Sequence, residues 1–180
     1  MIRTFVAIDL PTDIKQSLAS PIERLKSRNP AVRWVRPDAM HITLKFLGDI
    51  PEDAVGPVSA DLDEISAVTS PLRLGLSGFG AFPGVHRPRV VWVGVTGDTV
   101  RLADLARRVD EACARHGVKR ERRPFTGHIT LGRLRQPSVV DLRIEPVPSV
   151  FEATEIILYR SDLSPSGARY TALHASRLKA

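Results

Sequence analysis

The chain has 180 residues, 43% of them hydrophobic and 26% charged, which is typical of a globular protein with one domain or two small lobes. It contains no run of about 18 apolar residues, and its first residues lack the layout of a secretory signal. We therefore expect a cytoplasmic protein without a membrane span. The single cysteine, Cys113, excludes an intramolecular disulfide and a cysteine-based metal cluster. The net charge of +6 suits a polyanionic partner, although many basic proteins bind no nucleic acid.

The first half of the chain is predicted to alternate strands with two helices. Alternating residues predict a strand over 2–9, and an apolar stripe predicts a helix that begins at Thr12 or Asp13. Pro21 lies within that stripe and predicts a kink or a break. A short strand over 33–35, a strand over about 41–47 and a second helix follow. The apolar face of this second helix carries Val55, Val58, Leu62 and Ile65.

The second half is predicted to contain more strands and one long helix. Leucines at 72, 74 and 76 alternate as in a strand, and the glycine-rich segment 78–84 is predicted to be a loop. The boundary between two halves, 1–84 and 85–180, is expected at this loop. The clearest helix begins near Thr99 and ends at Gly117, a suitable C-cap residue. The other predicted elements are strands over 89–95, from residue 128, over 151–160 and over 168–178, with irregular segments over 135–149 and 161–167.

The order of these elements favours one fold class. Strands outnumber helices and come in adjacent runs separated by short turns, which favours an α+β fold with largely antiparallel sheets. The sequence contains neither G-x-G-x-x-G nor G-x-x-x-x-G-K, the glycine-rich motifs that hold phosphates in nucleotide-binding folds.

One four-residue motif occurs twice, as His41-Ile-Thr-Leu44 and as His128-Ile-Thr-Leu131, 87 positions apart. Side chains two apart on a strand share a face, so each histidine is predicted to lie beside its threonine, Thr43 or Thr130, opposite an apolar face. A single copy would be ordinary on the wet face of a strand. The identical repeat, at a spacing close to half of the chain, predicts two matched histidines that meet across one cleft.

Two histidines on opposite sides of a phosphorus atom suit phosphodiester chemistry. Displacement at phosphorus needs a proton removed from the attacking oxygen and another delivered to the leaving oxygen, and imidazole performs either task near neutral pH. The threonine hydroxyls, pointing the same way, can donate hydrogen bonds to the non-bridging oxygens. This scheme requires no metal.

Four segments resemble the two-histidine phosphoesterase superfamily, and within it the RNA 2′,3′-cyclic phosphodiesterases, also called 2′-5′ RNA ligases. The segments are 3–11, 41–48, 89–95 and 128–133. The resemblance implies a bilobal fold in which each lobe is an antiparallel sheet backed by helices, with the active site in the cleft between them. It is compatible with an exchange of terminal strands between the halves.

The resemblance also implies an activity. It implies hydrolysis of RNA 2′,3′-cyclic phosphate ends to 2′-phosphomonoesters, with His41 as proton donor to the leaving 3′ oxygen and His128 as proton acceptor from water. Ligation to a 2′-5′ linkage would be the reverse direction. The implied partner is RNA with a 2′,3′-cyclic phosphate or 2′-phosphate end, and the implied protein is a monomer without a cofactor.

Other residues are candidates for substrate binding. Arg133 falls on the apolar phase of its strand, but a bulge at Gly132 could re-aim it as a phosphate clamp, the alternative being an edge residue in solvent. Lys45 shares the phase of His41 and could add positive potential to the cleft, or be a solvated lysine. Five aromatic residues could stack on a terminal base, although most are expected in the core. They are Trp34, Phe79, Phe82, Trp92 and Tyr170.

Three alternatives stay open from the sequence. The basic run 119–123 could follow an RNA backbone, but a solvated loop is the simpler interpretation. The substrate could instead be a small cyclic nucleotide or an ADP-ribose cyclic phosphate. Finally, the chain could be a non-catalytic module that binds RNA ends, although binding alone does not require two matched proton-transfer groups.

Overall fold

The computed structural model describes residues 1–145, 148–165 and 167–179. Within these residues, nine strands form one antiparallel sheet in the order β7-β4-β5-β6-β3-β1-β8-β9, with β2 added beside β6. The strands are β1 (Ile2–Asp9), β2 (Arg33–Trp34), β3 (His41–Ile50), β4 (Leu72–Phe82), β5 (Val90–Gly97), β6 (His128–Arg133), β7 (Val150–Ala153), β8 (Glu155–Ser164) and β9 (Gly167–Arg177). The helices are α1 (Thr12–Ser17), α2 (Ala19–Arg28), α3 (Val55–Ala67) and α4 (Thr99–Ala114).

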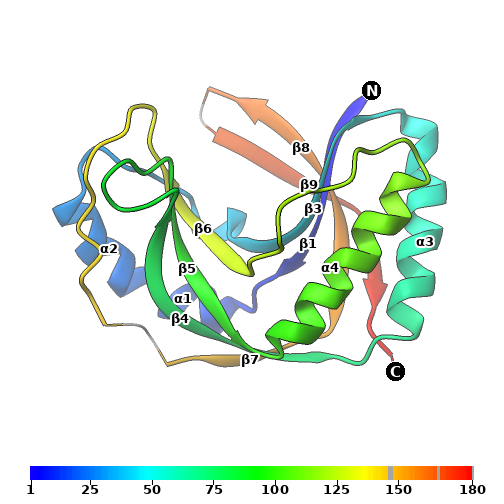
Figure 1. The fold of residues 1–180 in the computed structure, drawn as a ribbon, viewed down its shortest axis with the longest axis horizontal. Coiled ribbons are helices and arrows are strands. Elements are labelled where there is room, and N and C mark those ends of the chain that lie inside the picture. The colour runs from blue at the N-terminus through cyan, green and yellow to red at the C-terminus, as the bar shows by residue number, and fades with distance from the viewer. Residues whose placement is uncertain (146–147, 166, 180) are drawn as a thin grey trace.

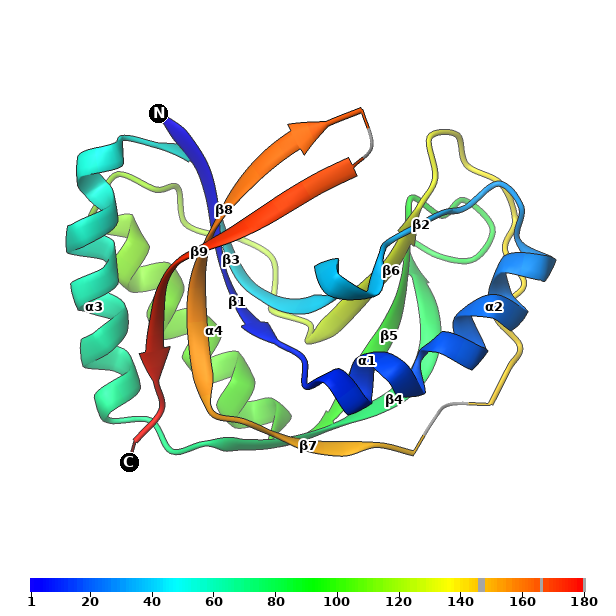
Figure 2. The same ribbon diagram turned by 180° about the vertical axis from the view of Figure 1, so that it is seen from behind.

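The sheet is curled and divides into two lobes, which confirms the predicted fold class. Figures 1 and 2 show α3 and α4 side by side against the part of the sheet formed by β1, β3, β8 and β9. Helices α1 and α2 lie at the other end, beside β4, β5 and β6. The two parts of the sheet meet where β3 pairs with β6. Each part takes strands from both expected halves of the chain, because β4 pairs with β5 and β8 pairs with β1.

The predicted break near Pro21 is confirmed. Helix α1 ends at Ser17 and α2 begins at Ala19, so Pro21 is the third residue of α2. Proline has no N–H to donate to the carbonyl four residues earlier, here that of Ser17, and the first turn of a helix tolerates this loss. The chain therefore forms two separate helices here and not one kinked helix.

Several predicted element boundaries were wrong. Strand β4 continues to Phe82, through the segment predicted to be a loop. Its glycines serve packing there, since a Cβ on Gly80 would collide with the ring of Trp92 on the paired strand β5. The predicted strand over 151–160 is two strands, because β7 pairs with β4 while β8 pairs with β1 in the other lobe. The segment 161–167 extends the β8–β9 hairpin instead of forming a loop up to residue 167, and residue 166 lies outside the described residues.

The core confirms the predicted helix stripes. The apolar face of α4 is buried, and each such side chain contributes on the order of 1.5–3 kcal/mol through removal from water. Burial also raises the pKa of the Cys113 thiol to about 11, so this residue is a small apolar part of the core. None of the described helices is long and apolar enough to span a membrane.

Two glycines with positive φ allow a stability test. Gly97 (φ 89°) begins the turn before α4, and a Cβ there would collide with the backbone carbonyl of Arg73, whereas Gly48 (φ 74°) has open space around it. We expect Gly48→Ala to lower the free energy of unfolding by about 1–2 kcal/mol, the cost of left-handed backbone, and Gly97→Ala to lower it further. Urea denaturation of both variants measures this, and equal losses would contradict the collision.

Candidate active site

The two histidine motifs lie on neighbouring strands of the sheet. Strands β3 and β6 run antiparallel and pair at Ile42 and Ile129, which are both fully buried. In such a pair the residues on either side of this point share the opposite face, so each motif's histidine lies across from the other's threonine. The same strand geometry places the two histidine Cα atoms on the order of 8 Å apart. We call this surface the histidine face; it carries His41, Thr43, His128 and Thr130, all partly exposed.

Each motif ends in a bulge. The pairing of β3 with β1 passes over Leu44, and the pairing of β6 with β5 passes over Leu131. Burial over six residues is then the same in both strands, with the fourth and fifth residues both buried and the sixth exposed. A bulge therefore turns the fifth residue into the core and returns the sixth to the histidine face. The fifth residues are Lys45 and Gly132, and the sixth residues are Phe46 and Arg133.

The two imidazoles are held in the same way. Nδ1 of His41 lies 2.8 Å from the carbonyl oxygen of Ala39, and Nδ1 of His128 lies 2.8 Å from that of Thr126. A carbonyl oxygen can only accept, so each Nδ1 must carry the proton of this bond. When a ring held in this way is neutral, its Nε2 keeps a lone pair, available for proton transfer.

The threonines add hydroxyl groups to the same surface. Over the described ranges 1–145, 148–165 and 167–179, neither Thr43 nor Thr130 uses its hydroxyl in a hydrogen bond with the protein. Both are partly exposed beside a histidine. Two hydroxyl donors on the histidine face can therefore serve a bound oxyanion.

Aromatic rings surround His41. The ring of Phe5 stacks on the imidazole at a centroid distance of 4.8 Å, and Tyr170 meets it edge-on at 5.3 Å. Tyr159 stacks on Phe5 from the other side at 5.3 Å. Burial raises the pKa of the Tyr159 hydroxyl to about 12 and, to a smaller extent, that of Tyr170. This wall fixes the imidazole plane and removes water from around it.

A second aromatic pair lies beside His128. Phe82 meets this imidazole edge-on at 5.1 Å and contacts Trp92, whose ring centroid is 6.5 Å from that of His128. The structure thus brings Phe82, Trp92 and Tyr170 to the histidines. It places the other two stacking candidates, Trp34 and Phe79, against the core.

Burial and charge act in opposition on His41. Desolvation is the largest effect and lowers the pKa of His41 to about 4. The carbonyl of Ala39 and the carboxylate of Asp9, on the adjoining strand, favour the charged ring, while the cations Lys15 and Arg133 disfavour it. Asp9 is itself paired with Lys15, at 2.8 Å. Without a ligand, His41 is therefore neutral at neutral pH.

Arg133 belongs to the histidine face. The bulge predicted at Gly132 is confirmed by the shift in pairing beside it, and the Arg133 side chain is exposed. Its charge lowers the pKa of both His41 and Tyr170, so it lies near the aromatic rings around His41. Gly132 has no room for a side chain, since a Cβ would collide with Val32.

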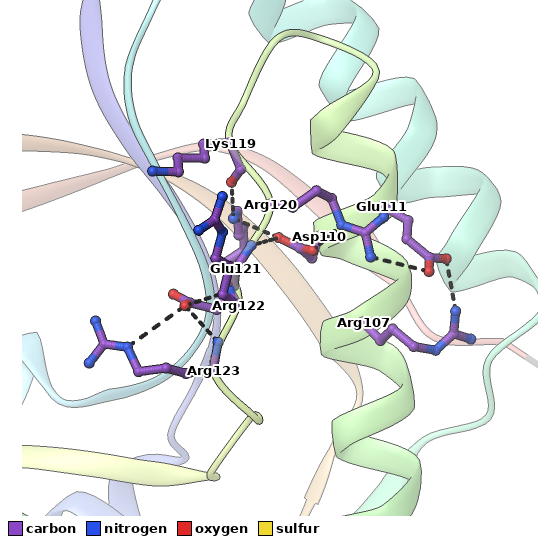
Figure 3. Close-up of polar contacts among 9 residues, drawn as sticks. Arg107, Asp110, Glu111, Lys119, Arg120, Glu121, Arg122 and Arg123 are labelled. Atoms are coloured by element: carbon purple, nitrogen blue, oxygen red, sulfur yellow. Dashed lines mark hydrogen bonds and ion pairs between the residues drawn. The ribbon is translucent and has the colours of Figure 1, made fainter.

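Lys45 does not share the face of His41, and the phase predicted for it was wrong. The bulge in β3 turns the side chain into the protein, where its Nζ pairs with Asp110 of α4 at 2.6 Å and donates to the carbonyl of Lys119 at 2.6 Å. Asp110 also accepts from Arg120 and from the N–H of Glu121 (Figure 3). Lys45 thus anchors the segment that leads to His128 instead of facing a ligand.

Three residues of the site were missed from the sequence. Phe46 is 59% exposed and takes the position on β3 that Arg133 takes on β6. Alignment of two six-residue segments, His41–Phe46 with His128–Arg133, would have revealed it. Phe5 and Asp9 lie on β1 and come close to His41 because β1 pairs with β3. The local sequence does not indicate this pairing.

The remaining histidines serve elsewhere. His116 pairs with Asp61 at 2.7 Å, His174 pairs with Asp63 at 2.9 Å, and His86 is exposed. Among the residues that the structure describes, no group of three or more histidine, cysteine and carboxylate side chains could hold a metal ion.

The two His-x-Thr strands, joined in one antiparallel sheet, agree with the resemblance to the two-histidine phosphoesterases that the sequence shows. A family profile described as LigT like Phosphoesterase matches residues 8–92 and, a second time, residues 93–170. The two matches together span most of the chain. The chain belongs to the LigT-like phosphoesterase family, within the two-histidine superfamily.

Known proteins agree with this assignment over the full fold. An RNA 2′,3′-cyclic phosphodiesterase of Methanothermobacter thermautotrophicus is 30% identical, over 98% of this chain and 99% of its own length. One of Geobacillus stearothermophilus is 36% identical over 88% of this chain, which spans about half (52%) of that relative. The crystal structure of Escherichia coli LigT complexed with 3′-AMP is similar with a TM-score of 0.82 and 31% identity, covering 99% of both chains.

The environment of His41 predicts its titration. We expect NMR of the free protein to show His41 titrating near pH 4. Its unfolded-state pKa is about 6.5, so between these values the unfolded chain binds more protons, and the free energy of unfolding falls with falling pH by up to about 3 kcal/mol. His41→Gln removes this dependence. A His41 that titrates near 6.5 would contradict the desolvation.

The buried ion pair predicts a stability difference. Lys45→Met leaves the Asp110 carboxylate without its buried cation and should cost about 3–5 kcal/mol, whereas Arg107→Met, which breaks exposed pairs on the same helix, should cost less than about 1 kcal/mol. Despite burial, hydrogen bonds from Lys45, Glu121 and Arg120 hold the pKa of Asp110 below its usual value. Its stabilising effect is therefore present above about pH 4 and lost as pH falls through the folded-state value.

Urea denaturation at neutral and acidic pH measures both effects. The difference between wild type and Lys45→Met should shrink on acidification. Equal stability of the Lys45→Met and Arg107→Met variants would show that the buried pair contributes nothing.

Proposed function

We propose that this chain hydrolyses RNA 2′,3′-cyclic phosphate ends to 2′-phosphomonoesters. The observation that supports this most is the matched pair of imidazoles, each with Nδ1 bonded to the carbonyl two residues earlier and Nε2 left for chemistry on a shared surface. Two groups of this kind supply what displacement at phosphorus requires, one base and one acid. The relatives named RNA 2′,3′-cyclic phosphodiesterase support the choice of substrate.

In the proposed reaction water attacks phosphorus and the bond to the 3′ oxygen breaks. His128 Nε2 takes the proton from water, and His41 gives a proton from Nε2 to the departing 3′ oxygen. The phosphate stays on the 2′ oxygen. With a 5′-hydroxyl in place of water as the nucleophile, the same step on the 2′,3′-cyclic phosphate would give a 2′-5′ linkage, with the 3′ oxygen again leaving and taking the proton from His41.

The acid role of His41 requires a proton that the free protein does not hold at neutral pH. An anionic phosphate beside the ring favours imidazolium, as Asp9 already does. The same phosphate, bound by Arg133, offsets one of the two cations that keep the ring neutral. Substrate binding would therefore raise the pKa of His41 and supply the acid when it is needed.

The other residues of the histidine face have parts in this proposal. The hydroxyls of Thr43 and Thr130 would donate to the non-bridging oxygens, where negative charge increases during the reaction. Phe82, Trp92 and Tyr170 would hold the terminal nucleoside by stacking. The complex of Escherichia coli LigT with 3′-AMP supports a site for one nucleotide at an RNA end.

Turnover of a short RNA ending in a 2′,3′-cyclic phosphate, with EDTA present, tests the proposal. His41→Ala and His128→Ala should each lower kcat by roughly 10²-fold or more, and wild type should show a bell-shaped pH profile. His174→Ala, which changes a histidine paired with Asp63, is the matched control and should keep full activity.

The products and substrates distinguish the alternatives. A 3′-phosphate product would contradict the assigned leaving group. Turnover confined to cyclic mononucleotides or ADP-ribose cyclic phosphate would replace RNA with a small substrate. RNA binding that survives both histidine substitutions, without turnover by folded wild type, would identify a binding module instead of an enzyme.

A further inference from the structure

A basic loop connects α4 to β6 and ends close to His128. We use this name for residues 119–123, Lys-Arg-Glu-Arg-Arg. Figure 3 shows that its basic side chains take two directions. Arg120 turns toward α4, whereas Lys119, Arg122 and Arg123 lie on the side of the loop that faces away from this helix.

Arg120 is occupied within the protein. Its guanidinium pairs with Asp110 and lies 3.4 Å from Glu111, both on α4. The charge of this residue is therefore matched by carboxylates and serves the attachment of the loop. The basic side chains that remain for contacts outside the protein are those of Lys119, Arg122 and Arg123.

Hydrogen bonds to Lys45 of β3 and Asp110 of α4 hold the backbone of the loop. Lys45 donates to the Lys119 carbonyl, and the N–H of Glu121 donates to Asp110 at 3.0 Å. The Glu121 carboxylate then accepts the N–H groups of Arg122 and Arg123, at 2.9 and 3.0 Å. These bonds lower the pKa of Glu121 and keep it ionised.

The side chains above this backbone are free to reach a ligand. Lys119 and Arg122 are exposed, and the Arg123 side chain is 91% exposed, with its Nε no closer than 3.8 Å to Glu121. In this loop, Lys45, Asp110 and Glu121 all form hydrogen bonds with the backbone, which distinguishes it from a loop held only by solvent. The arrangement fixes where three cations are presented, and this reduces the entropy lost when they bind.

The loop leads into the second histidine motif. Its anchor, Lys45, is on β3 four residues after His41, and Arg123 precedes His128 by five residues. An extended chain advances at most about 3.6 Å per residue, so Arg123 lies within about 18 Å of His128. The carbonyl of Thr126, between them, is the one that orients the His128 ring.

We propose that Lys119, Arg122 and Arg123 bind the phosphodiester backbone of the RNA strand that leads to the terminal cyclic phosphate. This inference rests on the proposed function and extends it, because it makes the substrate a polymer. A cyclic mononucleotide has one phosphate, which the histidines would hold, and nothing to place on the loop. Exposed cations in a row bind successive phosphates without reading the sequence, and their affinity depends on salt.

The test compares wild type, a loop variant and a control variant on two substrates. Lys119→Gln/Arg122→Gln/Arg123→Gln removes the three charges, while Arg24→Gln/Lys26→Gln/Arg107→Gln removes three exposed charges from α2 and α4 as a matched control. Hydrolysis is measured for a short single-stranded RNA with a 2′,3′-cyclic phosphate end and for 2′,3′-cyclic AMP, over a range of salt concentrations.

For the RNA, we expect the loop variant to raise KM about tenfold at low salt. The slope of log kcat/KM against log salt should become shallower by about 2, at roughly 0.7 for each phosphate of a single strand that the variant no longer binds. Its turnover of 2′,3′-cyclic AMP should equal that of wild type, and the control should resemble wild type on both substrates.

Several outcomes would overturn the inference. An unchanged KM for RNA would show that the loop binds no backbone, an equal loss on both substrates would show that it only positions His128, and an equal loss in the control would show a general effect of net charge. If wild type hydrolyses neither substrate, the proposed function fails. In that case the salt dependence of RNA binding, measured by fluorescence anisotropy on the same variants, still decides whether the loop binds RNA.

Discussion

The two histidines share a surface because β3 and β6 meet at one residue pair, Ile42 with Ile129. This contact joins two lobes that are otherwise built around separate ends of the sheet. Because the strands are antiparallel and the motifs identical, the contact lies on a local two-fold relation, and each element of one motif has a counterpart in the other. Ile42 and Ile129 are fully buried, so separating the lobes at this pair would expose apolar surface to water. The free energy that keeps the lobes together therefore also keeps the two histidines in place.

The two-fold relation stops at the residues after the motifs, and the differences there are chemical. The fifth residue is a buried lysine in one strand and a glycine in the other, while the sixth is a phenylalanine and an arginine. The lysine ties β3 to α4 and to the basic loop, whereas the glycine lets β6 approach Val32. Beside the histidines, Asp9 pairs with His41 where Gly94 pairs with His128. A symmetric framework therefore holds two imidazoles in unequal environments, which suits the proposed acid and base roles.

Much of the framework could be predicted from the sequence, because it depends on local periodicity. The two-residue period of strands separated His41 and Thr43 from the buried Ile42, and helix stripes identified the buried face of α4. The features that could not be predicted depend on pairing between distant strands. The Lys45 side chain points into the protein because β3 has a bulge where it pairs with β1. In β4, Gly80 resembles a loop residue in the sequence but instead makes room for the ring of Trp92.

The acid–base pair of the proposed reaction depends on the same aromatic walls that shape the site. The rings of Phe5 and Tyr170 exclude water from His41, and this desolvation outweighs the attraction of Asp9. A neutral His41 next to Arg133 leaves the histidine face with a positive charge that favours the entry of a phosphate. Once the phosphate neutralises that charge, the same low-polarity surroundings strengthen its attraction for a proton on His41. In the free protein, burial disfavours the protonated form of His41. In the complex with a phosphate, the same burial would favour it, so His41 need not be protonated before the substrate binds.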